Sequence, residues 1–278
     1  MKSTLRQLLF ILSSTLVINA AVINNANAET SNLVQPTYNT ASLTSEGGWQ
    51  FLIAPYFWAA SLNGDFTIQN FSTHFSLPFS DIWNNLDFAG ELHLEANNGP
   101  WTIMLDPTYL KLTANNNVGN VSAKLTSELW VVDGALFYTF FNNPLPNDQM
   151  FTMEGEVGAR YFGLENMESL NYNSPINPAL NVGSSTTVDN NFLTPIVGLR
   201  FTYDLNQINH LWLRGDVGGF GIDDVSNTWQ AILGYDYSMS DNVDLGLAYR
   251  VLKIDFNKNI SSVNSYWYGP EIGVGFHF

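Results

Sequence analysis

The sequence predicts an all-β protein, a transmembrane antiparallel up-and-down β-barrel of about ten strands. Three observations lead to this prediction. From Trp49 onward, strand-like runs alternate with turn-forming segments, and short turns alternate with longer polar ones. Within the runs, apolar side chains alternate with small or charged ones, as in a strand with two unlike faces. Aromatic residues make up 14% of the chain without long apolar runs, a composition typical of barrels with aromatic girdles.

The first 28 residues have the features of an export signal. Lys2 and Arg6 precede an apolar run over 8–22, and the small residues 26–28 suit cleavage by a signal peptidase. The apolar run is short for a membrane helix and is interrupted by polar residues. We therefore predict that residues 1–28 are a signal peptide that is removed.

The rest of the chain divides into a short leader and one domain. Residues 29–46 are polar and show no periodicity, so we predict a disordered periplasmic leader. Residues 47–278 contain no domain break and no apolar stretch of 18 residues, so no helix is expected to span a membrane. We predict that 47–278 form the barrel.

Charge and cysteine content exclude several classes of function. The formal net charge is -15, and loss of Lys2 and Arg6 leaves 8 basic residues against 25 acidic ones, or -17. Such a chain has no basic surface for phosphates, so nucleic acid is not an expected partner. Cysteine is absent, which excludes disulfides and thiolate chemistry. We expect no cofactor and no metal site.

Ten strands follow from the positions of the turns, with boundaries good to a few residues. The segment 62–85 leaves an alternative open: it could hold one more hairpin, which would make twelve strands, or 79–86 could form a helical turn. We expect long loops at 114–120 and 167–187. The predicted strands are 49–61, 86–97, 100–113, 121–141, 150–166, 188–204, 209–221, 226–239, 242–256 and 265–278.

The phase of the alternation predicts which side chains face lipid. In 121–141 the even-numbered positions, among them Trp130 and Tyr138, are mostly apolar, and the odd-numbered ones include Asp133. In 242–256 Leu247 takes the outward phase and Ala248 the inward one. This polarity is the reverse of a soluble barrel, whose interior is apolar, and it fits a barrel that lies in lipid.

The last strand carries a further signal. Its alternate residues Phe278, Phe276, Val274 and Ile272 share one face, whereas the other face is small or polar. This pattern resembles the C-terminal signal strand of bacterial outer-membrane β-barrels, whose terminal Phe is read by the barrel-assembly machinery. The resemblance implies that machinery as a partner and the Gram-negative outer membrane as the location.

Two internal segments add a second resemblance. Residues 56–65 (YFWAASLNGD) and 80–112, which begin SDIWNNLDFAGELHLE and include LDPTYLKL, look like a recurring group of uncharacterised proteobacterial outer-membrane proteins of porin-like character. The likeness spans most of the chain after residue 47. It implies a β-barrel in contact with outer-membrane lipid and lipopolysaccharide. It carries no catalytic residue across to this chain.

Charged residues of inward phase form the candidate site. All four arginines beyond the signal point inward at mid-strand, and Glu91, Asp106 and Asp133 do so on strands without a neighbouring arginine. An acidic wall would thus face a basic one. The charges could cross-link a filled interior, because buried charges need partners. They could instead flank a narrow water-filled constriction for ions or small solutes. The predicted lumen network is Arg160, Arg200, Arg214, Arg250, Glu91, Asp106, Asp133, Glu156, Asp216 and Glu271.

Other readings remain open beside this barrel without a catalytic site. His93 shares its phase with Glu91 and Glu95 and could act as a general base or metal ligand. His74, Asp81 and Asp87 could form a water-activating site of the omptin type, and a lipid-modifying surface enzyme is a related alternative. The segment 167–187 could serve as an adhesin loop. We expect a barrel that is not an enzyme.

Overall fold

The computed structural model defines which parts of the chain can be described. The predicted signal peptide, 1–28, and the predicted leader, 29–46, lie outside the described residues. No helix among the described residues is long and apolar enough to cross a membrane. The structure describes residues 48–68, 71–147, 149–176, 181–258 and 261–278.

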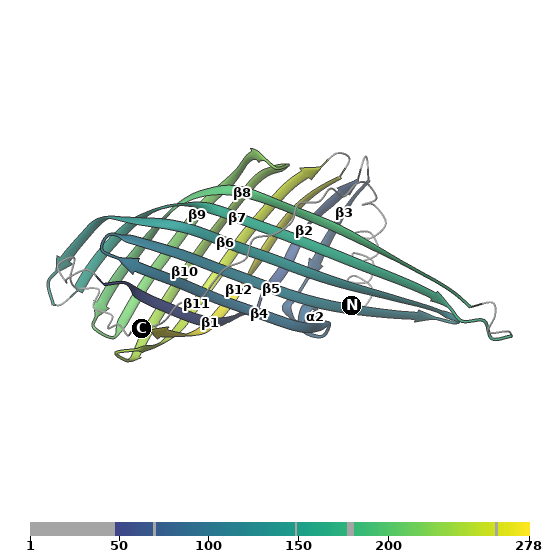
Figure 1. Cartoon of the computed structure of the whole chain (residues 1–278), viewed down its shortest axis with the longest axis horizontal. Helices are drawn as coiled ribbons and strands as arrows, with labels where there is room; N and C mark the ends of the chain where they lie inside the picture. The colour runs from purple at the N-terminus through teal and green to yellow at the C-terminus, as the bar shows by residue number, and fades with distance from the viewer. Residues whose placement is uncertain (1–47, 69–70, 148, 177–180, 259–260) are drawn as a thin grey trace.

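The described chain is almost entirely antiparallel β-sheet, and it closes into a barrel (Figure 1). Apart from one hairpin, successive strands along the chain are neighbours in the sheet. They are β1 (Gln50–Trp58), β2 (Ser61–Ile68), β3 (Phe71–Leu77), α2 (Phe79–Trp83), β4 (Leu86–Asn98), β5 (Trp101–Val118), β6 (Val121–Leu145), β7 (Gln149–Tyr172), β8 (Val182–Asn206), β9 (Asn209–Ile222), β10 (Val225–Ser240), β11 (Val243–Lys258) and β12 (Ser261–His277).

Ten strands form the closed ring, as the sequence predicts. The ring runs from β1 to β4 and on through β12, and β12 pairs with β1 to close it. At the closure, Phe51 and Phe278 exchange two backbone hydrogen bonds of 3.1 and 2.9 Å. In a closed ring, the backbone N–H and C=O groups of every strand in the ring find partners on a neighbouring strand. A sheet surrounded by lipid requires this, because no water is available to pair with them.

The segment 62–85 contains both features that the sequence left as alternatives. The second half of β12 pairs with β1, and its first half, from Ser261 to Tyr268, pairs with β2. Strand β2 forms a hairpin with β3. This hairpin adds two strands to the sheet without entering the ring. Helix α2 follows it, and the ring of Phe57 on β1 contacts Phe79 and Trp83 of the helix edge-on, at 5.9 and 5.7 Å.

The strands extend further on one side of the barrel than the sequence predicts. The segment 114–120, predicted as a loop, belongs mostly to β5 and turns tightly at Gly119, whose φ is 59°. Most of 167–187, also predicted as a loop, belongs to β7 and β8, which pair as far as Tyr172 and Val182. Both predictions were wrong because these extensions are mostly polar and carry only scattered apolar side chains, such as Met167, Leu170 and Val182, without a regular alternation. Paired backbone in water carries no apolar alternation for the sequence to show.

The barrel therefore has two unlike ends. We call the end with the connections 99–100, 146–148, 207–208 and 241–242 the turn end, and the opposite end the extended end. In Figure 1 the long strands β5 to β8 reach far beyond their neighbours at the extended end.

The outer surface is apolar over the middle of the barrel, as the strand phases predict. The rings of Trp101 and Tyr138 pack at 4.6 Å near the turn end, and those of Tyr109 and Trp130 pack at 4.5 Å further up. Exposed aliphatic side chains lie around the ring: Ile103, Leu105, Leu136, Val157, Leu193, Val197, Leu199, Leu213, Val217, Leu233, Leu247 and Ile272.

This polarity predicts unequal effects of neighbouring substitutions on β11. Leu247 points outward and is 49% exposed, whereas Ala248 points inward. Leu247→Arg is expected to lower the free energy of unfolding by about 2–4 kcal/mol in a bilayer, because its charge meets hydrocarbon near the midplane. Ala248→Ser should change it by less than about 0.5 kcal/mol. Denaturant titration in lipid vesicles measures both, and equal effects would contradict the assigned faces.

Candidate functional site

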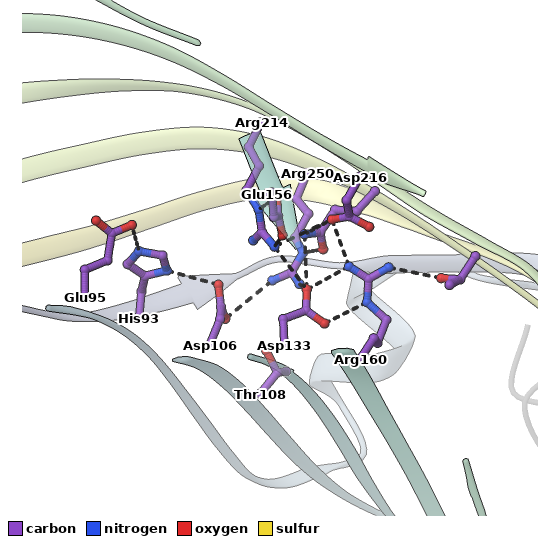
Figure 2. A network of polar contacts seen from close by, with 12 residues as sticks. His93, Glu95, Asp106, Thr108, Asp133, Glu156, Arg160, Arg214, Asp216 and Arg250 are labelled. Atoms are coloured by element: carbon purple, nitrogen blue, oxygen red, sulfur yellow. Dashed lines mark hydrogen bonds and ion pairs between the residues drawn. The ribbon is translucent and has the colours of Figure 1, made fainter. Parts of the chain in front are cut away.

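The centre of the lumen holds a buried ion cluster built around Arg160. Its guanidinium donates two hydrogen bonds of 2.7 Å to Asp133, which lies directly opposite on β6, and one of 3.1 Å to Asp216 on β9 (Figure 2). The side chains of all three residues are 0% exposed. Charges held this far from water are stable only when they are paired with good geometry.

Arg214 on β9 forms the second pair of the cluster. Its Nε and Nη2 atoms donate to the two carboxylate oxygens of Glu156 on β7 at 3.0 and 2.5 Å. Nη2 also lies 3.6 Å from Asp216 and 3.8 Å from Asp133. The two-pronged geometry matches the planar guanidinium to a carboxylate, which is the strongest arrangement for such a pair.

Arg250 on β11 ties this cluster to the other side of the ring. It donates to the amide oxygen of Gln230 at 2.6 Å and to the hydroxyl of Tyr56 at 3.1 Å. Its other charged neighbours lie between 3.7 and 3.9 Å: Asp106, Asp133 and Glu271. Tyr56 donates in turn to Asp106 at 2.7 Å, so the network spans the lumen from β1 and β5 to β11.

Gln230 and Tyr56 are network members that the sequence analysis did not select. Gln230 uses its amide nitrogen to donate to Asp133 and Asp216, both at 3.3 Å. Its inward phase on β10 was the available signal. Tyr56 carried no comparable signal, because an aromatic ring near a strand end fits a girdle equally well.

A second charged layer lies nearer the turn end. Arg200 on β8 donates to Glu154 at 2.5 and 3.1 Å and also to Glu95 on β4 across the lumen. Its guanidinium stacks 4.4 Å above the ring of Phe137. His93 contacts Glu95 at 3.1 Å and Asp106 at 3.2 Å, and so joins this layer to the central cluster.

Glu91 does not join the group of His93 and Glu95 that the sequence suggested. Its carboxylate accepts a 2.5 Å hydrogen bond from the backbone N–H of Trp58, where β1 ends. The indole of Trp58 donates to the carbonyl of Gly269 at 3.2 Å. At Gly269 a Cβ would lie 2.1 Å from the carbonyl oxygen of Ala59, so the backbones approach closely at this fork. The Glu91 carboxylate therefore takes the place of a backbone acceptor at the end of β1, where β12 changes its partner from β1 to β2.

The acidic and basic walls predicted from the sequence do not exist as separate surfaces. Asp133, expected to lack a neighbouring arginine, lies directly opposite Arg160. The prediction was wrong because it compared whole strands. Glu156 and Asp216 lie on the same strands as Arg160 and Arg214, β7 and β9, so acidic and basic side chains are mixed on those strands.

A layer of apolar side chains covers the central cluster on the side of the extended end. The rings of Phe162 and Phe192 stack at 4.9 Å with an angle of 9° between their planes. These packed rings and aliphatic side chains fill this level of the lumen with apolar groups. The buried members of the layer are Trp58, Ala60, Leu110, Leu129, Val131, Phe162, Phe192, Val225, Leu252 and Ile254.

The residues considered for hydrolysis do not assemble. His74 pairs with Asp65 at 2.9 Å on the β2–β3 hairpin, and both side chains are largely exposed. Asp87 accepts a 2.6 Å hydrogen bond from Thr113 on β5. Asp81 lies in the first turn of α2. Within the described part of the chain, no group of three or more histidine or acidic side chains is placed to hold a metal ion.

Comparison with known proteins finds similarity to solved structures alone. No protein-family model and no curated protein matches it. The similar solved structures are bacterial outer-membrane β-barrel proteins.

Three of these structures illustrate the degree of similarity. The outer membrane protease OmpT from Escherichia coli is 10% identical with a TM-score of 0.48, over 86% of this chain and 100% of that one. Ail, the attachment invasion locus protein of Yersinia pestis, is 10% identical with a TM-score of 0.34, over 84% and 100%. The Pseudomonas putida toluene transporter TodX is 8% identical with a TM-score of 0.30, over 84% and 90%. At these values no activity is carried over.

The ion cluster predicts a specific pattern of stability. Arg214→Met is expected to lower the free energy of unfolding by about 3–5 kcal/mol, because it leaves Glu156 buried without its partner. The double variant Arg214→Met, Glu156→Leu removes both charges at similar volume and should recover most of that loss. Denaturation in detergent, followed by tryptophan fluorescence, measures the two values.

The opposite result would identify a wet lumen. If Arg214→Met costs less than about 1 kcal/mol, the pair is screened by water, and the cluster is not buried as described.

Proposed function

We propose that this chain is an integral β-barrel of the bacterial outer membrane, closed at its centre, which anchors an extended β-sheet at the cell surface. The observation that carries this proposal is the arginine–carboxylate cluster that spans the lumen with Arg160 completely buried. In this proposal the barrel is not an open pore. It also has no catalytic role, and the charges of the lumen serve to hold the wall together.

The dimensions of the outer surface support insertion in a membrane. On β5, Trp101 and Tyr109 mark the lower and upper aromatic bands and are eight residues apart. At about 3.3 Å per residue and a tilt of about 40°, the bands are separated by roughly 20 Å along the barrel axis. Aromatic girdles flank the apolar band of outer-membrane barrels in this way.

The unequal ends support an orientation. Outer-membrane barrels have short periplasmic turns and longer segments outside the cell. The turn end would then face the periplasm and the extended end would face outward. This orientation places the paired extensions of β5 to β8 above the membrane as a surface platform.

Closure of the lumen rests on the charged layers and on the apolar layer that adjoins them. The charged layers bridge opposite sides of the ring through Arg200 and Arg250. His93 links Glu95 on its own strand to Asp106 on the neighbouring strand. The apolar layer above these charged layers excludes water. A ring of ten strands is little wider than the eight-stranded barrels whose interior side chains fill completely.

Planar-bilayer recording tests the closed state. The wild-type barrel is expected to show no steady conductance. Arg214→Ala removes a large side chain and strands Glu156, so we expect it to open a small, cation-selective leak. Leu247→Ala, on the lipid-facing side, is the matched control and should stay silent. A stable wild-type channel with defined ion selectivity would contradict the proposal.

A second candidate function is binding at the cell surface by the tip of β7 and β8. There Ile176 is 90% exposed and Val182 is 67% exposed. Such a tip could contact an apolar surface on another cell or molecule.

Protease treatment of intact cells tests both the orientation and the exposure of this tip. We expect cleavage within 167–187 and none at the turn 146–148. Membrane fractions opened on both sides are the control and should be cut at either place. Cleavage of intact cells at 146–148 alone would invert the orientation.

A further inference from the structure

The outer face of the barrel carries a polar hollow directly above its upper aromatic band. This hollow, which we call the outer patch, has a volume of about 200 Å³ and lies across β4 to β7. Its polar side chains come from four neighbouring strands: Asp87, Lys111, Thr113, Lys124, Thr126, Glu128 and Glu165.

The position of the outer patch is set by register. Lys111 follows the girdle residue Tyr109 by two positions on the same outward phase of β5, and its cross-strand partner is Glu128. The hydroxyl of Tyr109 donates to Glu128 at 3.0 Å, so the girdle and the patch are joined. In a membrane, this height corresponds to the headgroups rather than to the hydrocarbon.

The charges of the outer patch are unusual for this chain. The four arginines beyond the first 28 residues, at 160, 200, 214 and 250, are engaged in the lumen, so lysine supplies the cations of the outer face. Two of the four lysines of the same region line this one hollow. Lys111 pairs with Glu128 at 2.6 Å, and Thr113 donates to Asp87 at 2.6 Å.

One juxtaposition places two carboxylates side by side in the patch. Glu128 and Glu165 lie directly opposite each other on β6 and β7 with the same outward phase. Like charges in this arrangement destabilise a strand pair. Hydroxyl groups of a ligand could donate to these carboxylates, and the ammonium groups on either side could hold its anionic groups.

We propose that the outer patch binds the phosphorylated sugar headgroup of a glycolipid in the outer leaflet. Lys111 and Lys124 hold phosphate oxygens, and Glu128, Glu165 and Thr113 take the hydroxyls of the sugar. The headgroup sits above Tyr109 and Trp130, and its acyl chains lie along the apolar wall below them. The inference rests on the proposed membrane location, because a barrel in water would not meet such a lipid at this height.

Binding of bisphosphorylated lipid A to the purified full-length barrel in neutral detergent tests the inference, with native mass spectrometry as the readout. Each of Lys111→Gln and Lys124→Gln is expected to weaken binding about fivefold, and the double variant about 25-fold, from the usual contribution of a lysine near anionic lipid. Lys253→Gln is the matched control. Lys253 lies outside the hollow, 5.7 Å above the ring of Tyr266, and its loss should change binding less than about twofold.

Three results would overturn the inference. The first is a double variant that binds lipid A within about twofold of the wild type. The second is equal binding of lipid A from which both phosphates have been removed. If inorganic phosphate at the same concentration displaces lipid A, the site holds an anion without selecting a lipid, and the inference also fails.

A separate readout keeps this test apart from the proposed function. Heat-modifiable migration of each variant and its recovery in the outer-membrane fraction report on barrel insertion. A barrel that inserts correctly but binds lipid A independently of both lysines would contradict the inference and leave the proposed function standing. A wild-type chain that is absent from the outer membrane sinks the proposed function instead.

Discussion

The need to pair buried arginines inside a narrow ring governs this structure. Removing an ion from water costs several kcal/mol, so each guanidinium in the lumen must meet carboxylates with good geometry. Ten strands bring opposite walls close enough for Arg200 to reach Glu95 and for Arg250 to reach Asp106. A wider ring would leave these groups in separate, hydrated layers. The same contacts that stabilise the wall therefore also fill the lumen.

The filled centre explains why polarity changes along the barrel axis. Below the upper aromatic band, the outer face is apolar and the inner face is charged. Above that band the inner face becomes apolar, with Phe162 and Phe192 at its centre, and the outer face becomes polar at Lys111 and Glu128. This reversal fits a chain that leaves hydrocarbon for water at that height. The outer face of the extended strands carries charged groups that a membrane core could not accommodate.

The sequence was informative wherever lipid and lumen impose opposite demands. The inward phase of Asp133 and the outward phase of Trp130 could be read from alternation alone, because one face must be apolar. The ring of ten strands also followed from the turns. The ends of β7 and β8 could not be predicted, because their few apolar residues, among them Met167, Leu170 and Val182, do not alternate regularly with polar ones.

The pairings inside the lumen needed three-dimensional register. Glu91 and His93 share one phase, yet Glu91 satisfies the N–H of Trp58 and His93 bridges two carboxylates. Which role each takes depends on where β1 ends and β2 begins. The sequence shows no clear marker for that fork, since Ala59 and Ala60 are neither turn formers nor strand breakers.

The central claim is that the lumen is closed between the charged layers and the extended end, and cysteine accessibility tests it most directly. The natural chain has no cysteine, so single thiols can be placed without background. Thr139→Cys lies on the inward phase near the turn end, and Ala114→Cys lies on the inward phase near the extended end. We predict that a membrane-impermeant thiol reagent added on one side of a bilayer modifies only the cysteine of that side. Modification of both cysteines from one side would contradict the closed lumen.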